Sequence, residues 1–117
     1  MSEEPIISII LPVFNAEEYL MHALKSILLQ TVENWELILI DDGSTDNSFE
    51  ICNSIDDKRF IRVKNNKNYG HSYSCNRGIE IAKGKYITRM DADDISFPNR
   101  LETQLKFMEN NPDVDAI

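Results

Sequence analysis

Two nearly continuous apolar runs, rich in β-branched residues, constrain the fold of this chain more than any other feature. The first covers residues 6–11 and ends at Pro12, and the second covers residues 35–40 and ends at a pair of aspartates. Runs this short without polar alternation are typical of strands buried on both faces, as in parallel sheets. Between them, over about residues 17–29, apolar residues recur with helical spacing, which predicts an amphipathic helix.

The rest of the chain continues the same alternation of strand and helix. We expect a helix over residues 47–55, a less apolar strand near a sheet edge over 59–64, a helix over 72–82 and a strand over 85–90. Pro98 is placed to begin a further helix with Leu101, Leu105 and Met108 facing inward, and residues 114–117 have the pattern of another strand. The alternation predicts an α/β fold: a three-layer, Rossmann-like, mostly parallel sheet with helices on both faces.

Composition excludes several classes of protein. The 117 residues carry a formal net charge of -8, so no basic surface is available to displace counterions from a nucleic acid. The sequence has no run of membrane-spanning length and no signal-peptide pattern, so we expect a cytoplasmic protein. A full-length protein could instead lie peripherally at the inner membrane. Cys52 and Cys75 are far apart and have no zinc-site spacing, which predicts free thiols.

Polar residues follow three of the predicted strands, at the end of the sheet where α/β folds bind ligands. They are Asn15 after the first strand, Asp41 and Asp42 after the second, and Asp91, Asp93 and Asp94 after the fourth. Acidic turns are often simply solvated. Two acidic groups on one rim, neither followed by a basic residue, are also explained by Mg²⁺ or Mn²⁺, which proteins hold with carboxylates and substrate phosphates. The pattern leaves both alternatives open: solvated turns, or a divalent-cation and nucleotide site.

Four short motifs keep their order and spacing along nearly the whole chain. They are SIILPVFN at residues 8–15, IDDGSTD at 40–46, NRG at 76–78 and MDADD at 90–94. Together they resemble the donor-binding half of family 2 glycosyltransferases, which have the GT-A fold. The resemblance implies metal-assisted transfer of a sugar, with inversion, from a nucleoside-diphosphate sugar to an acceptor hydroxyl, and a UDP-sugar is the expected donor. It also suggests polysaccharide biosynthesis as the setting.

The resemblance further implies roles for individual residues. Asp41 matches the aspartate that recognises the nucleotide base, and Pro12 and Val13 match positions that line the same base pocket. Asp91 is implied near the ribose, and Asp93 at the metal, Mn²⁺ or Mg²⁺, that bridges the diphosphate. Asp91 is also a candidate metal ligand.

Other positions match the family with less specific roles. Asn15 and Asp42 are candidates for nucleotide binding, but they and Asp94 also suit turn capping or support of the residues around them. Arg77 matches a basic residue in the helix before the metal-binding strand, and a structural salt bridge with a carboxylate of the rim is an equal alternative. His71 departs from the small apolar residue that the family has beside Gly70.

No catalytic residue is identified in this sequence. The resemblance implies that a carboxylate base in the acceptor-binding half deprotonates the acceptor, so we expect this base downstream of Ile117. We also expect residues 1–117 to form a single, truncated donor-binding domain. The acceptor, whether a saccharide, a lipid or another hydroxyl compound, is left open. A sheet cut at its edge would favour self-association.

Two other functions remain open at this stage. One is a nucleotide-binding or assembly module that has no catalytic activity as this fragment. The other is phosphoryl transfer through an aspartyl nucleophile, which requires an aspartate after the first strand, where this chain has Asn15.

Overall fold

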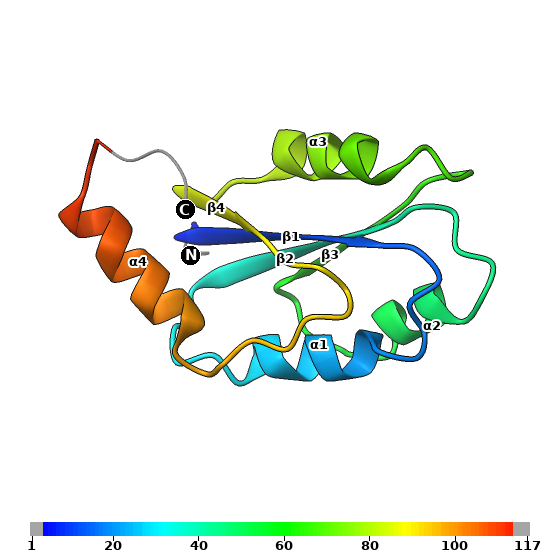
Figure 1. Cartoon of the computed structure of the whole chain (residues 1–117), viewed down its shortest axis with the longest axis horizontal. Helices are drawn as coiled ribbons and strands as arrows, with labels where there is room; N and C mark the ends of the chain where they lie inside the picture. Colours follow the sequence, from blue (N-terminus) through cyan, green and yellow to red (C-terminus); the bar gives the residue numbers. More distant parts are fainter. Residues whose placement is uncertain (1–3, 114–117) are drawn as a thin grey trace.

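A four-stranded, wholly parallel sheet forms the centre of the molecule (Figure 1). The computed structural model describes residues 4–113, so the strand expected at residues 114–117 lies outside the described residues. The strands are β1 (Ile7–Val13), β2 (Trp35–Asp41), β3 (Phe60–Lys64) and β4 (Tyr86–Arg89). The helices are α1 (Leu20–Leu28), α2 (Ser48–Asn53), α3 (His71–Ile81) and α4 (Arg100–Asn110). The predicted order of strands and helices is therefore confirmed.

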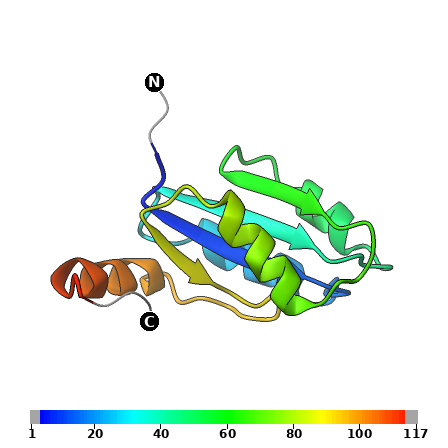
Figure 2. The same ribbon diagram turned by 90° about the horizontal axis from the view of Figure 1, so that it is seen from above.

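Helices cover both faces of the sheet, as predicted. Figure 1 shows α3 on one face and α1 and α2 on the other, and Figure 2 shows α3 lying across β1 and β2. The larger part of the core lies under α1 and α2, where Leu11, Leu24 and Leu37 are fully buried. A smaller cluster of Ile10, Ile38 and Ile40 lies on the opposite face. Both β1 and β2 are buried along their whole length, which explains their continuous apolar sequences.

The strand order is β3-β2-β1-β4, so the chain adds strands in one direction as far as β3 and then crosses to the other side of β1. This reversal between β1 and β4 is the switch point of the sheet, where α/β folds open a crevice at the carboxyl ends of the strands. The position of β3 at a sheet edge agrees with its lower apolar content.

Two strands extend further than the sequence suggested. Pro12 was expected to end the first strand, but it lies within β1, paired in register with Ile40. The pairing of β4 with β1 stops at Ile10, so Pro12 has no neighbour on that side and its missing N–H leaves no ladder partner unsatisfied. Asp41 likewise belongs to β2, in register with Val13 and Lys64.

The two cysteines are expected to differ strongly in reactivity. Burial, reinforced by the negative charge of Asp41, raises the pKa of the Cys52 thiol to about 12, whereas Cys75 is partly exposed on α3. Because only the thiolate is a nucleophile, iodoacetamide at pH 8 should modify Cys75 and not Cys52 in the folded protein, and both after denaturation. Mass spectrometry of the native and denatured protein measures this, with Cys75→Ala as the control. Full native labelling of Cys52 would contradict the burial of α2.

Candidate functional site

A pocket of about 540 Å³ opens at the switch point of the sheet. Pro12, Phe14 and Asn15 line it from the end of β1, and Asp91 and Asp93 line it from the segment after β4. The N–H of Met90 donates to the carbonyl of Ile10 at 2.9 Å, which fixes the start of the acidic segment against β1. The parallel topology thus brings together residues that are more than seventy positions apart in the sequence. We call this the switch-point pocket.

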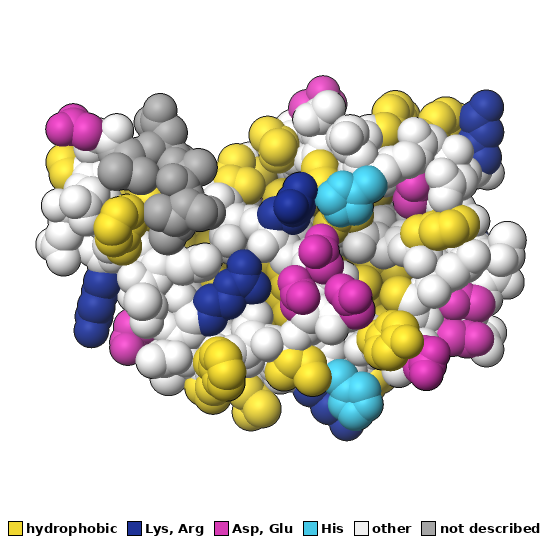
Figure 3. Space-filling view, viewed as in Figure 1, with side chains coloured by type: hydrophobic (Ala, Val, Ile, Leu, Met, Phe, Trp, Pro, Cys, Tyr) yellow, Lys and Arg dark blue, Asp and Glu magenta, His cyan; other side chains and the backbone are white. Residues whose placement is uncertain are grey.

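Three exposed carboxylates gather at the edge of this pocket. Asp91, Asp93 and Asp94 each offer one oxygen, and these three oxygens lie within 4.8 Å of one another. A tight turn holds them together, because the N–H of Asp94 donates to the carbonyl of Asp91 at 3.0 Å and the N–H of Asp91 donates to the Asp94 carboxylate at 3.2 Å. Figure 3 shows a compact acidic group beside a histidine near the middle of the face in view. An exposed set of hard oxygen donors fits Mg²⁺ or Mn²⁺ that completes its coordination with phosphate oxygens.

His71 connects the acidic group to a second, smaller pocket. Its Nε2 lies 3.7 Å from Oδ1 of Asp91, and both side chains are about half exposed. His71 also lines a pocket of about 180 Å³, together with Pro12, Val13, Asp42 and Gly70. We call this the Asp42 pocket. Since Pro12, Phe14 and His71 line both pockets, the two form one continuous surface along the end of β1.

Asp42 is the carboxylate that faces the smaller pocket. Its Oδ1 accepts hydrogen bonds from the N–H of Tyr69 and the side-chain amide of Asn65, each at 2.9 Å, and its Oδ2 accepts one from the N–H of Gly70 at 2.9 Å. Burial alone would raise the pKa of Asp42, but these hydrogen bonds, helped by the Ser74 hydroxyl, outweigh it and lower the pKa. The side chain is therefore an ionised acceptor that has been rigidly oriented.

Asp41 occupies a different environment from the one implied by the resemblance. It is 1% exposed and lines neither the switch-point pocket nor the Asp42 pocket. Strand alternation directs its side chain to the same face as Leu37 and Leu39, close enough to Cys52 to affect the pKa of that thiol. Neither of its carboxylate oxygens has a hydrogen-bond partner among residues 4–113. The carboxylate on the pocket wall is Asp42, one residue later than the sequence suggested.

Asn15 connects the loops that follow β1 and β2. Its N–H donates to the Ser44 hydroxyl at 2.9 Å, and its Oδ1 accepts from the N–H of Thr45 at 2.8 Å. Gly43, with a φ of 73°, lets this second loop approach the β3–α3 loop, because a Cβ there would lie 2.5 Å from the carbonyl carbon of Lys67. Asn15 therefore both lines the switch-point pocket and fixes its rim. The residue at this end of β1 is an amide, not the carboxylate that aspartyl phosphorylation requires.

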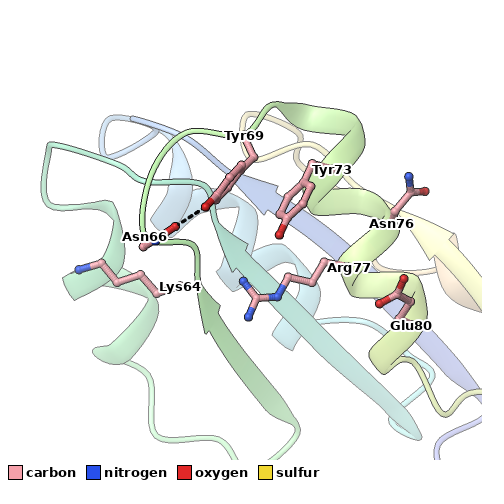
Figure 4. Close-up of a pocket in the computed structure, with 7 residues that line it drawn as sticks. All are labelled: Lys64, Asn66, Tyr69, Tyr73, Asn76, Arg77 and Glu80. Carbon is pink, nitrogen blue, oxygen red and sulfur yellow. Dashed lines mark hydrogen bonds between the residues drawn. The ribbon is translucent and has the colours of Figure 1, made fainter.

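Arg77 lies outside both pockets. Figure 4 shows it projecting from α3 into a groove of about 620 Å³, near Lys64 and Tyr73. Its Nη1 donates to Oδ1 of Asn65, and it forms no ion pair within the part of the chain that the structure describes. The expected salt bridge with the rim is therefore not seen in this part of the chain, and the nucleotide contact stays a prediction. Asn65 was missed because no motif marks it: it is one amide in a run of polar loop residues.

The parallel sheet between two helical layers, with an acidic group at its switch point, forms an α/β domain with the architecture expected for the GT-A fold. Residues 8–117 match the family model described as Glycosyl transferase family 2. The chain belongs to this family.

Curated relatives agree with this family. An uncharacterized glycosyltransferase of Haemophilus influenzae is 50% identical over 109 residues, covering 92% of this chain and 44% of the relative. The glycosyltransferase GlyG of Streptococcus pneumoniae is 43% identical over 120 residues, covering 100% and 38%. The chain thus spans less than half of the length of these relatives.

Among solved structures, Staphylococcus aureus TarS (residues 1–349) in complex with UDP has a TM-score of 0.85 at 24% identity, covering 91% of this chain and 32% of TarS. The mannosyltransferase PcManGT of Pyrobaculum calidifontis, in complex with GDP-Man and Mn²⁺, has a TM-score of 0.79 at 22% identity, covering 92% and 33%. These similarities establish the shared fold. Within residues 4–113, no helix has the length and apolar character needed to cross a bilayer.

Proposed function

We propose that this chain binds a nucleoside-diphosphate sugar and supplies the donor site for transfer of the sugar to an acceptor hydroxyl. The observation that carries the proposal is the continuity of the two pockets. An oriented, ionised Asp42 lies in one, and the acidic group of Asp91, Asp93 and Asp94 lies at the edge of the other. The complexes of TarS with UDP and UDP-GlcNAc, and of PcManGT with GDP-Man and Mn²⁺, support a donor of this class.

Each part of the proposed site suits one part of the donor. Asp42 would accept a hydrogen bond from a ring N–H of the base, and Pro12 and Val13 would contact the face of the base. Asp93 and Asp91 would hold Mn²⁺ or Mg²⁺ next to the diphosphate, with Asp94 closing the turn. A bound divalent cation stabilises the charge that develops on the leaving diphosphate.

The acceptor and the catalytic base fall outside this assignment. Uridine as the base and inversion at the anomeric carbon are parts of the proposal that rest on the family alone. The residues assigned here bind and orient the donor, and none of them is assigned to deprotonate the acceptor.

Thermal unfolding with UDP and Mn²⁺ tests donor binding directly. A ligand that binds only the folded state, at one hundred times its Kd, adds about 2.7 kcal/mol of stability, which raises the Tm of a domain of this size by several degrees, on the order of 10 °C. UDP with EDTA, and Mn²⁺ alone, should give much smaller shifts. An unchanged Tm with saturating UDP and Mn²⁺, together with no heat of binding in calorimetry, would contradict the proposal.

A further inference from the structure

A buried amide connects Arg77 to the Asp42 pocket. Asn65 is 1% exposed and lies directly after β3. Its Nδ2 donates to Oδ1 of Asp42 at 2.9 Å and to the Ser74 hydroxyl at 3.0 Å, while its Oδ1 accepts from Nη1 of Arg77. Arg77 thus reaches the pocket carboxylate through one intervening side chain, although it lines neither pocket itself.

The charges on either side of Asn65 determine which way its amide points. In the opposite orientation, the amide oxygen would face the Asp42 carboxylate and the amide NH₂ would face the Arg77 guanidinium, so both contacts would be repulsive. Arg77 therefore keeps the NH₂ group directed at Asp42. Figure 4 shows the Arg77 side chain extended from α3 into the open groove, away from the carboxylate of Glu80.

The orientation of Asn65 has a direct consequence for the free acceptor position of Asp42. A carboxylate offers about four acceptor positions. Two N–H bonds to Oδ1 and one to Oδ2 occupy three of them, and the fourth is shared between the Ser74 hydroxyl and any N–H group that enters the pocket. A carboxylate fixed in this way accepts a ring N–H, as in uracil or guanine, and disfavours a base with only a ring acceptor at that edge, such as cytosine.

We propose that Arg77 and Asn65 are positioning residues that make the Asp42 pocket selective for bases with a ring N–H donor. This inference rests on the proposed function, because it requires that Asp42 meets the base of the donor. Arg77 acts through Asn65 and touches neither the nucleotide nor a metal. If Arg77 is removed, the buried Asn65 oxygen loses its partner and only Asp42 and Ser74 still hold the amide, so Asp42 is left with a less firmly oriented donor.

The test compares UDP with 3-methyl-UDP, which lacks the ring N–H, in the presence of Mn²⁺. Calorimetry well below the Tm should show that the wild type prefers UDP. Arg77→Met should weaken UDP binding by about fivefold or more while leaving the weak binding of 3-methyl-UDP nearly unchanged. Lys64→Met is the matched control, since it removes another cation from the same groove. It should retain the wild-type preference.

The outcomes separate this inference from the proposed function. Failure of the wild type to bind UDP contradicts the proposed function itself. If the wild type binds UDP and Arg77→Met prefers UDP over 3-methyl-UDP as strongly as the wild type does, only the positioning role is overturned. An equal loss of affinity for both nucleotides in Arg77→Met also overturns that role, because it indicates general structural damage. If Arg77→Met does not fold, Arg77→Gln replaces it, and an unchanged preference in that variant overturns the inference in the same way.

Discussion

Asp93→Ala is expected to remove the metal-dependent part of UDP binding. Asp91, Asp93 and Asp94 offer three oxygens within 4.8 Å of one another, and the loss of one leaves a set that holds a divalent cation poorly. Affinity for UDP in Mn²⁺ should fall at least about tenfold, which is ~1.4 kcal/mol. Calorimetry with and without EDTA measures the change, and the variant should respond little to the chelator.

The folding stability of Asp93→Ala should stay close to that of the wild type, or increase. The three carboxylates are exposed and repel one another without a cation, so removing one relieves repulsion. Asp56→Ala removes an equal charge from the exposed turn between α2 and β3 and serves as the control for net charge. If both variants lower UDP affinity by the same factor, the effect is long-range electrostatics and the acidic group is a solvated turn.

The fold could be predicted because the strongest signals in the sequence are local. The apolar runs that became β1 and β2 are too short and too continuous for amphipathic helices, and helical periodicity separates them. Pro12 was misleading, since its effect on a strand depends on whether a neighbouring strand needs its N–H. That requirement is set by where β4 ends, which is a tertiary property.

The acidic group of the site could also be predicted, but its partner carboxylate was displaced by one residue. Once β2 is known to include Asp41, strand alternation puts its side chain with Leu37 and Leu39, and Asp42 becomes the residue on the pocket side. Because β2 is buried on both faces, its sequence does not reveal which face α3 covers. The role of Asn65 was even less visible, because it depends on two contacts made across the sheet end by Asp42 and Arg77.

Gly84→Ala is expected to destabilise the fold strongly. A Cβ at this position would lie 2.6 Å from the backbone nitrogen of Ser8 and 2.8 Å from the carbonyl carbon of Ile7, and backbone atoms inside a sheet cannot move aside cheaply. The loss of stability should be about 2–4 kcal/mol, which combines overpacking with a weakened buried hydrogen bond. Urea unfolding measures it as a lower midpoint at an unchanged m-value.

The reason for this sensitivity is a buried polar network at the amino end of the sheet, which Gly84 closes. The Gly84 N–H donates to the Ser8 hydroxyl at 2.7 Å, and that hydroxyl donates to the Glu36 carboxylate at 2.5 Å. The Lys83 N–H donates to the same carboxylate at 2.7 Å. Glu36 is only 6% exposed, so any shift of the segment before β4 leaves a buried carboxylate short of donors.

Gly78→Ala is the matched control for this effect. Its Cβ would also be crowded, at 2.7 Å and 2.8 Å, but by methyl groups of Ile10 and Ile40 rather than by backbone. Rotamer changes can relieve part of that crowding, and replacing glycine inside α3 recovers up to about 1 kcal/mol of helix propensity. Gly78→Ala should therefore cost clearly less than Gly84→Ala. Equal costs would mean that helix packing, and not the polar network beside β1, dominates the stability of this end of the sheet.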